Sequence, residues 1–215
     1  MTSRRHGPSA QARRDALLRA TVEIVAERGV AAVTHRAVTE RAGLPLATVS
    51  YFFSSISELE TEALRVFVAE ERATQVAAAE CLAAEQLTAD AVGRALTAAT
   101  APRYPDSLAF FESLLHAARS EDFRDAVREA LDASRAVANA ALQAVGAPDP
   151  ETVAPALTAL AHGMALHQLA VPGSIDESGS FQAFRALVLG YLLQSGHTDL
   201  ALALAQDASK ADAAR

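Results

Sequence analysis

The chain has 215 residues and a net charge of −7, and 51% of its residues are hydrophobic, a composition typical of one globular domain or of a small domain joined to a larger body. Its single cysteine, Cys81, excludes an intrachain disulfide framework and a cysteine-rich zinc site, and we expect it to be a small buried apolar residue. No apolar run reaches the roughly 18–20 residues of a membrane span and no secretory signal opens the sequence, so a cytoplasmic protein without membrane contact is expected.

The first two predicted elements are an arm and a helix. Residues 1–10 are polar and include Gly7 and Pro8, which favours a disordered arm. Apolar residues then recur at a spacing of three to four over residues 12–28, the pattern of an amphipathic helix. Gly29 follows directly and marks the end of this helix.

Two short helices around a glycine turn come next. Thr34 is a good N-cap for a helix over residues 35–42, and Gly43 is a typical end signal. Pro45 suits the first turn of a third helix over residues 46–52. A helix followed by two short helices around such a turn predicts a helix-turn-helix, whose second helix lies in the DNA major groove while its first crosses the backbone.

The remainder of the sequence predicts a helical body. Ser55 or Ser57 caps a long fourth helix that runs to about Leu82. The fold class is therefore predicted to be all-α, with a three-helix head joined by a long helix to a C-terminal bundle. Prolines and glycines separate the later helical patterns, which cover residues 88–100, 105–119, 122–145, 150–171 and 178–195, with a loop over 172–180. The predicted boundaries are 1–10 for the arm, 11–56 for the head, 57–205 for the body and 206–215 for a frayed tail.

The charge is distributed unevenly between head and body. Residues 1–56 carry eight arginines against four acidic side chains, a net charge of +4. The residues from 57 onward carry 11 basic and 22 acidic side chains, a net charge of −11. Because DNA phosphates attract a locally basic surface, a chain that is acidic in total can still bind DNA through its N-terminal part.

The segment THRAVTERAGLPLATVSYFFSSISEL, residues 34–59, resembles the N-terminal signature of the TetR family of transcriptional repressors. A threonine caps the second helix, an Ala-Gly-aliphatic turn follows, aromatic residues close the third helix, and Glu-Leu opens the fourth. The resemblance covers about residues 12–64, whereas the body resembles the family only in its length and number of helices. It implies a one-component bacterial regulator with a DNA-binding head and a body that binds a small molecule and dimerises.

The resemblance also implies which residues contact DNA. Arg36 is expected to reach a guanine edge or a phosphate, and His35 beside it a phosphate. Hydroxyl groups of the third helix fall on the family's phosphate-contacting positions, and apolar residues at its start can contact thymine methyl groups. The hydroxyl-bearing residues are Thr48, Ser50 and Tyr51, the apolar ones are Leu46 and Ala47, and Phe52 completes the predicted set.

Two positions depart from the family pattern. Many members have two adjacent tyrosines where this chain has Ser50 and Tyr51, and many have a phosphate-binding lysine where this chain has Ile56. The loss of one cation predicts that DNA binding depends on salt less steeply, by about one unit of slope. Arg4 and Arg5 of the arm could replace that contact from the minor groove, or they could be solubilising charges without a DNA role.

Candidate effector residues are polar or aromatic groups on otherwise apolar helices of the body. The resemblance implies that a small molecule binds there and shifts the two DNA-binding heads. The spacing of apolar residues from Val153 to Val171 places His167 on the inner stripe of its helix, although histidines and phenylalanines at such positions are more often core or interface residues than ligand contacts. The predicted pocket residues are Tyr104, Phe110, Phe111, His116, Arg119, Met164, His167 and Gln168.

The last two predicted helices of the body are expected to form the interface of a homodimer. Small residues over 154–165 permit close helix packing, and apolar residues recur at a spacing of three and four in the helix that follows. A twofold dimer would match a palindromic operator in double-stranded DNA, with half-sites roughly 34–36 Å apart. The predicted interface residues are Leu157, Phe184, Val188 and Tyr191.

The sequence contains no catalytic triad, phosphate-binding loop, dinucleotide motif or metal-ligand spacing, so no catalytic residue, metal or cofactor is expected. The predicted function is a repressor that a small-molecule effector of unknown identity and charge releases from DNA. Two alternatives stay open. One is a family member that activates transcription or has lost its effector response, and the other is an all-α enzyme or small-molecule carrier with an incidental helix-turn-helix.

Overall fold

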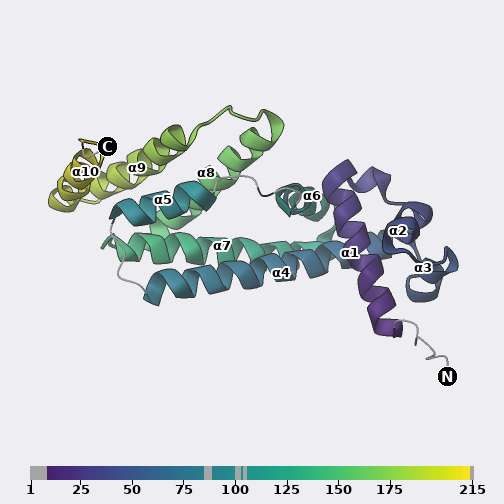
Figure 1. Ribbon diagram of the computed structural model, residues 1–215. Coiled ribbons are helices and arrows are strands. Elements are labelled where there is room, and N and C mark those ends of the chain that lie inside the picture. Colours follow the sequence, from purple (N-terminus) through teal and green to yellow (C-terminus); the bar gives the residue numbers. More distant parts are fainter. Residues whose placement is uncertain (1–8, 85–88, 100–102, 104–105, 214–215) are drawn as a thin grey trace, which may run out of the picture. The chain divides into compact units, whose positions relative to one another are not determined.

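The computed structural model describes residues 9–84, 89–99, 103 and 106–213. Within these ranges it contains ten α-helices and two short 3₁₀ turns and no strand, which confirms the predicted all-α class (Figure 1). Packing divides the described residues into two compact units. Unit 1 comprises the residues up to Glu70 and those between Arg103 and Val127, and unit 2 comprises the remainder.

Unit 1 is built from the N-terminal helices and one later helix. Leu17 and Ile24 of the first helix are fully buried, as are Val38 and Val49 of the next two. Phe123, which is also fully buried, belongs to this unit and not to the body. The elements of unit 1 are α1 (Ala10–Arg28), η1 (Val30–Ala32), α2 (His35–Ala42), α3 (Ala47–Phe52), the first half of α4 (Ile56–Ala84), α6 (Asp106–Arg119) and η2 (Glu121–Phe123).

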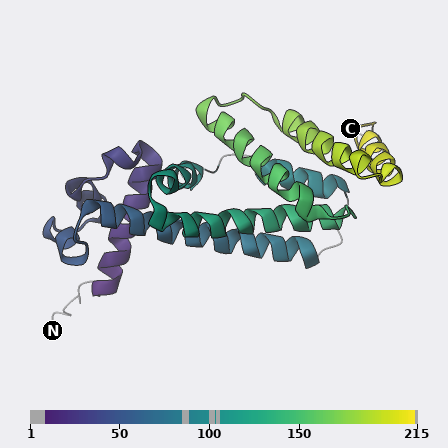
Figure 2. The ribbon, with the colours of Figure 1, turned by 180° about the vertical axis from the view of Figure 1, so that it is seen from behind.

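Unit 2 is a bundle with an aliphatic core. Leu142, Leu157, Met164, Phe184 and Leu192 form one buried cluster of this unit. In Figures 1 and 2, α8 and α9 form a hairpin, and α5 lies against both. The elements of unit 2 are the second half of α4, α5 (Ala89–Ala99), most of α7 (Arg124–Ala144), α8 (Pro150–Ala170), α9 (Glu177–Gln194) and α10 (Thr198–Ala213).

The division by packing differs from the boundary predicted after residue 56. Ala109, Ser113 and Ala117 make a buried face of α6, and α6 packs against α1. This helix therefore belongs with the helix-turn-helix, although more than 50 residues of sequence separate the two. Only contacts between distant segments determine this grouping, and a pattern of spacing within one helix carries no signal of it.

Two details of the predicted elements are wrong. No helix was predicted after residue 195, whereas α10 runs from Thr198 to Ala213. Cys81, which was expected to be buried, is exposed. The buried residues of α4 end at Val68, so the later turns that carry the thiol contribute little to the core.

In the described part of the chain, no helix combines the length and the apolar character that crossing a bilayer requires. The described residues also contain no cluster of histidine, cysteine, aspartate or glutamate arranged to hold a metal ion.

Candidate nucleic-acid interface and ligand cavity

Local hydrogen bonds fix both ends of α2. The Thr34 hydroxyl accepts a hydrogen bond from the Ala37 N–H at 3.1 Å, so the predicted N-cap is confirmed. Gly43 ends the helix with φ of +65°, a left-handed conformation that favours glycine. The buried Thr39 hydroxyl donates to the His35 carbonyl at 2.8 Å, which satisfies this polar group inside the unit.

The next helix, α3, is anchored by one side chain and leaves the others outward. Val49 is fully buried, whereas Leu46 is 59% exposed and Tyr51 is 75% exposed. The Tyr51 and Phe52 rings meet edge to face, with centroids 4.8 Å apart. Of the remaining predicted contact residues on this helix, Ala47 and Ser50 are exposed, and Thr48 and Phe52 are half-buried.

Arg36 projects from α2 into solvent. Its Nε donates to the Glu40 carboxylate at 2.7 Å, and the side chains of both residues are largely exposed. This hydrogen bond, with the negative charge of Glu40, raises the pKa of Arg36 above its ordinary value. His35 beside it is half-buried. The guanidinium is therefore oriented by a neighbour on its own helix while remaining accessible.

An ion-pair clamp, which sequence reasoning missed, joins α2 to α1. Arg41 Nη1 donates to the Glu23 carboxylate at 3.0 Å, and its two terminal nitrogens bind Glu27 at 2.9 and 2.5 Å. The hydrogen bond from Arg41 lowers the pKa of Glu27. The i,i+4 spacing of Glu23 and Glu27 on the outer face of α1 was an available signal for a shared cationic partner.

A second set of polar contacts fixes the entry into α4. The Ser55 hydroxyl accepts from the Glu58 N–H at 3.1 Å, so Ser55 rather than Ser57 is the cap. Glu58 in turn accepts from the Ser54 hydroxyl and from the Ser54 N–H, and these bonds lower its pKa. Ile56, where many family members have lysine, is half-buried.

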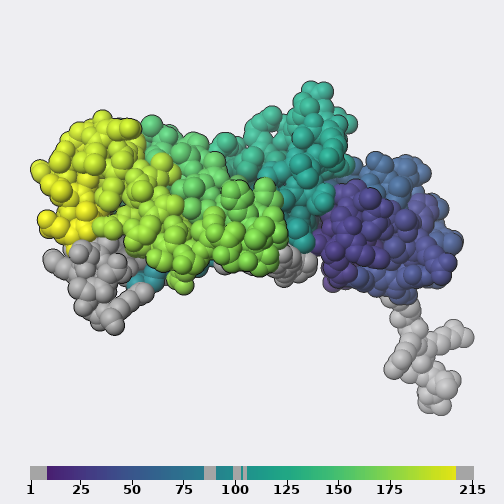
Figure 3. Space-filling view, turned by 90° about the horizontal axis from the view of Figure 1, so that it is seen from above, coloured from purple at the N-terminus to yellow at the C-terminus, as the bar shows by residue number. Residues whose placement is uncertain are grey.

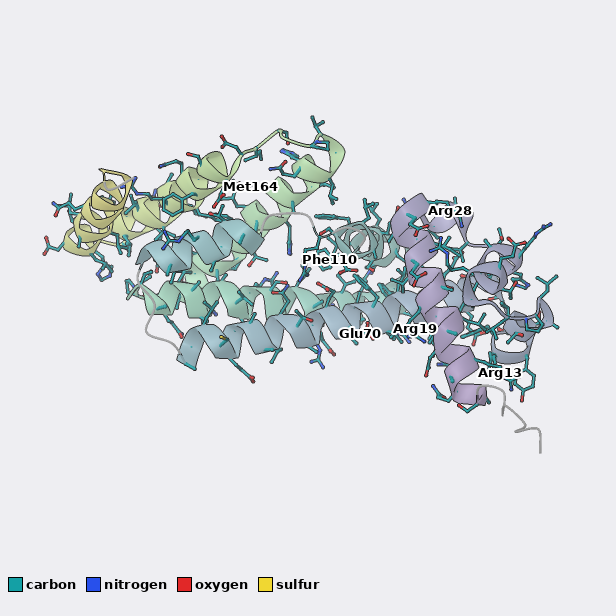
Figure 4. The ribbon with its side chains drawn as sticks, in the orientation of Figure 1. Arg13, Arg19, Arg28, Glu70, Phe110 and Met164 are labelled. Atoms are coloured by element: carbon teal, nitrogen blue, oxygen red, sulfur yellow. The ribbon has the colours of Figure 1, made fainter. Side chains whose placement is uncertain are left out.

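Arginines line α1 of the same unit. Arg13, Arg19 and Arg28 are spaced along this helix in Figure 4, and Arg19 and Arg28 are exposed. Arg14 instead serves the fold, because its guanidinium lies 5.3 Å from the centre of the buried Phe53 ring and pairs with Glu62. Some of the arginines that give the head its positive charge therefore make contacts within unit 1. Arg4 and Arg5 lie outside the described residues.

The predicted effector residues are divided between the units. Phe110, Phe111, His116 and Arg119 belong to α6 of unit 1, while Met164, His167 and Gln168 belong to α8 of unit 2 (Figure 4). Tyr104 lies outside the described residues.

Several of these residues have internal partners. His116 Nε2 lies 3.2 Å from the Thr61 hydroxyl, and burial followed by the charge of Arg119 lowers its pKa. Gln168 holds the loop after α8, since its amide oxygen accepts from the Gly173 N–H at 3.1 Å. His167, predicted on the inner stripe, is exposed.

Unit 2 contains an apolar cavity of about 80 Å³ between α5, α7, α9 and α10. None of the eight predicted effector residues lines this cavity. Their predicted role in effector binding stays a prediction. Arg185 is the one charged residue among the described residues that line the cavity. The apolar and small residues of its wall are Val92, Gly93, Leu96, Ala141, Leu142, Val145, Phe181, Phe184, Val188, Leu189 and Leu204.

Two of the four residues predicted at a dimer interface lie in the core of unit 2. Leu157 is 1% exposed and Phe184 is 2% exposed, so neither side chain is available to a second copy. Val188 lines the cavity, and the Tyr191 hydroxyl donates to the Pro148 carbonyl at 2.6 Å. The spacing of apolar residues predicted that these helices have apolar faces. It did not distinguish the face that packs in the core from a face that is free to contact a second copy.

Comparison with protein families gives two matches. The family model described as the tetracyclin repressor-like C-terminal domain matches residues 83–194, which is more than half of the chain. The model for bacterial regulatory proteins of the tetR family matches residues 17–63. A comparison with curated protein sequences finds no significant match.

Solved structures with a similar fold include two regulators and a multidrug binding protein. SCO7518, described as a candidate transcriptional regulator from Streptomyces coelicolor A3(2), is 28% identical with a TM-score of 0.60, over 82% of this chain and 98% of that one. SCO1917, a TetR-family member from Streptomyces coelicolor A3, is 26% identical with a TM-score of 0.63, over 82% and 98%. The multidrug binding protein EbrR, in complex with imidazole, is 27% identical with a TM-score of 0.58, over 85% and 96%.

The alternative of an all-α enzyme falls away, because proteins of this family are DNA-binding regulators and not enzymes. The helix-turn-helix of unit 1, the helical body and both family matches lead to one conclusion: the chain belongs to the TetR family of bacterial transcriptional regulators.

Proposed function

We propose that this regulator is a repressor that binds a palindromic operator as a homodimer and leaves it when a small molecule binds in unit 2. The observation that carries the proposal is the surface of α3, where Leu46 and Tyr51 are exposed on a helix whose neighbours are fixed by caps and ion pairs. Large exposed side chains on a fixed helix are typical of a contact surface. In a helix-turn-helix, the partner of this surface is the major groove.

The α2–α3 surface offers two kinds of DNA contact. Arg36 can exchange the Glu40 carboxylate for guanine O6 and N7 or for a phosphate, because all are strong acceptors. The hydroxyls of Thr48, Ser50 and Tyr51 suit phosphate oxygens and would fix the register of the head on the duplex. Apolar Leu46 and Ala47, at the start of α3, suit thymine methyl groups.

Exposed apolar positions and open glycine positions on both helices of the α8–α9 hairpin, which we call the dimer face, support the homodimer. Leu166 of α8 is 47% exposed and Leu193 of α9 is 52% exposed. A Cβ added at Gly163 or at Gly190 would meet no atom within 4 Å, so both helices also have open space at a glycine. An apolar surface with small residues fits the close approach of a second copy, which would complete a four-helix bundle across a twofold axis. Figure 3 shows α9 and α10, coloured light green to yellow, on one face of this unit.

The cavity of unit 2 supports a small-molecule effector. EbrR, whose fold is similar, is described as a multidrug binding protein and has been solved with imidazole and with malachite green. A ligand that binds one arrangement of the helices better than another shifts the population toward that arrangement. Release from DNA then requires the ligand-bound dimer to hold its heads at a spacing that no longer matches two half-sites.

The test is a DNA-binding titration with the full-length protein and labelled duplexes that cover the region upstream of its own gene and of the neighbouring genes. We expect one duplex to bind with a salt-sensitive affinity well above that of the others. Uniform binding to all duplexes, or none, would contradict the repressor proposal.

The sharpest variant in this titration is Arg36→Ala. A lost contact to guanine lowers specific affinity by about ten- to a hundredfold and leaves non-specific binding nearly unchanged. Arg135→Ala is the matched control, because Arg135 is an exposed arginine of unit 2 that pairs with Asp132 on its own helix. Equal affinities of the two variants would remove Arg36 from the interface.

A further inference from the structure

The cavity of unit 2 combines apolar walls with one positive charge. Three of the helices that enclose it, α5, α7 and α10, line it with apolar or small residues, and α9 adds Arg185 to its own apolar residues. Among the described lining residues there is no acidic side chain. This contrasts with the acidic character of the sequence from residue 57 onward, whose net charge is −11. A cation enclosed by apolar groups favours an anionic partner.

The guanidinium of Arg185 is fixed but incompletely satisfied. Its Nη2 donates to the Ala205 carbonyl of α10 at 2.8 Å, which holds the group at the cavity. Its Nε is buried and has no hydrogen-bond partner among the described residues. The cavity therefore borders a fixed guanidinium whose positive charge is not neutralised by any acidic side chain among the described lining residues.

The walls limit the size of an anionic partner. The Phe181 ring lies directly against Gly93, where an added Cβ would stand 2.4 Å from a ring carbon. Ala141 and Leu142 of α7, which also line the cavity, are each 1% exposed. Since pockets for drug-sized ligands measure roughly 300–1,000 Å³, a cavity of about 80 Å³ suits a much smaller molecule.

We propose that unit 2 binds a small apolar carboxylate, with the hydrocarbon part between α5, α7 and α9 and the carboxylate on Arg185. This inference names the chemical class of the effector and so rests on the proposed ligand-responsive function. A carboxylate offers the Arg185 guanidinium an opposite charge and a charge-assisted hydrogen bond, whereas an alcohol offers only a neutral acceptor and a protonated amine is repelled. The ligand would touch α9, the helix that also carries Leu193 of the proposed dimer face, and would thereby couple occupancy to the dimer.

The test uses three probes of equal chain length: hexanoate, 1-hexanol and hexylamine. Each is titrated into the full-length protein by isothermal calorimetry at pH 7.5, where hexanoate is an anion and hexylamine a cation. We expect saturable binding of hexanoate with at least about tenfold higher affinity than hexanol, and no binding of hexylamine. Equal binding of all three, a preference for the amine, or no saturable binding of any probe overturns the proposal.

Two variants assign the selectivity to Arg185. Arg185→Gln should lower hexanoate affinity about tenfold and leave hexanol affinity within about twofold. Arg135→Gln, the same change at an exposed position of unit 2, should alter neither. An unchanged hexanoate affinity in Arg185→Gln overturns the assignment. Ala141→Leu, which fills the cavity, should abolish binding of both hexanoate and hexanol, and thermal melting checks that this variant still folds.

Two further measurements separate this inference from the proposed function. Arg185→Gln should bind the operator as wild type does without ligand, because Arg185 belongs to unit 2. Hexanoate should then release wild type from DNA at concentrations that leave the variant bound. If the protein binds hexanoate but no operator, the repressor proposal is overturned and the carboxylate proposal stands. If Arg185→Gln changes the sedimentation coefficient, the cavity is a contact between two copies and the carboxylate proposal is overturned.

Discussion

Unit 1 and unit 2 both have apolar cores, and they differ in what accompanies that core. In unit 1, polar bonds join one helix to the next, as Arg41 does by binding Glu23 and Glu27, and serine and threonine caps fix the helix ends. In unit 2, small and aliphatic side chains pack along the helices and leave a cavity. Directional bonds hold a surface in one geometry, whereas aliphatic packing tolerates small displacements. The difference suits a head that reads DNA and a body that accommodates a ligand.

The largest expected effect tests this difference in the two cores. Leu59→Ala removes a fully buried side chain of unit 1 and should lower the free energy of unfolding by about 3–5 kcal/mol. Leu142→Ala should cost less, about 2–3 kcal/mol, because Leu142 already borders the cavity and has fewer contacts to lose. Urea unfolding followed by circular dichroism measures both. An equal or greater loss for Leu142→Ala would mean that unit 2 is packed as tightly as unit 1.

The next largest effect links the surface of unit 2 to the function of unit 1. Leu166→Glu combined with Leu193→Glu places charges on the proposed dimer face and should reduce specific DNA affinity by about a hundredfold or more, because a monomer contacts one half-site. Val76→Glu, at an exposed apolar position of α4 in unit 2, is the matched control. Sedimentation should show a monomer for the double variant only. A dimer that survives both charges would move the interface elsewhere.

A smaller effect compares one glycine from each unit. Gly43 and Gly146 have φ of +65° and +73°, and an added Cβ would meet no atom within 4 Å at either. Alanine at each position should therefore cost a similar amount of stability, about 1 kcal/mol from backbone strain alone. Only Gly43→Ala should also weaken DNA binding, because Gly43 sets the turn between α2 and α3. Thermal melting measures the stability of both variants, and DNA titration measures their affinity for the operator. Equal operator affinities of the two variants would show that the turn between α2 and α3 tolerates the strain.

The sequence predicts the head better than the body because the head depends on local chemistry. The bounds of α2 follow from the hydroxyl of Thr34 and the left-handed turn at Gly43, and both signals lie within ten residues of each other. The clamp formed by Arg41 was missed because its partners on α1 lie 14 and 18 residues away. Contacts of this kind require the path of the chain between the helices, which a spacing pattern does not contain.

The site of unit 2 shows why the remainder could not be predicted. His167 was assigned to a buried stripe by alternating steps of four and three, which average 3.5 residues per turn. An α-helix has 3.6 residues per turn, so the stripe drifts by about 20° every seven residues and His167 emerges at the surface. The cavity residues come from four helices whose meeting depends on the fold of the whole unit. Arg185 therefore had no local signal that distinguished it from a surface arginine.

The smallest expected effect is a pH dependence that compares one histidine from each unit. Burial lowers the pKa of His162 in unit 2 below its ordinary value of 6.5, and burial together with the charge of Arg119 lowers the pKa of His116 in unit 1. Below pH 6.5 the unfolded chain takes up protons at these histidines that the folded chain does not. Folding stability is therefore greatest above pH 6.5 and is lost as the pH falls from 6.5 through the lowered pKa values of the folded protein.

The melting temperature of wild type should therefore fall between pH 7.5 and 5.5, by no more than about 4 °C. His162→Gln should flatten this dependence more than His116→Gln does, because His162 is the more deeply buried of the two. His167→Gln, at an exposed position of the helix that carries His162, is the control. If His116→Gln has the greater effect, the pH response of the protein lies in the unit that carries the helix-turn-helix, and acidification should then change DNA affinity as well as stability.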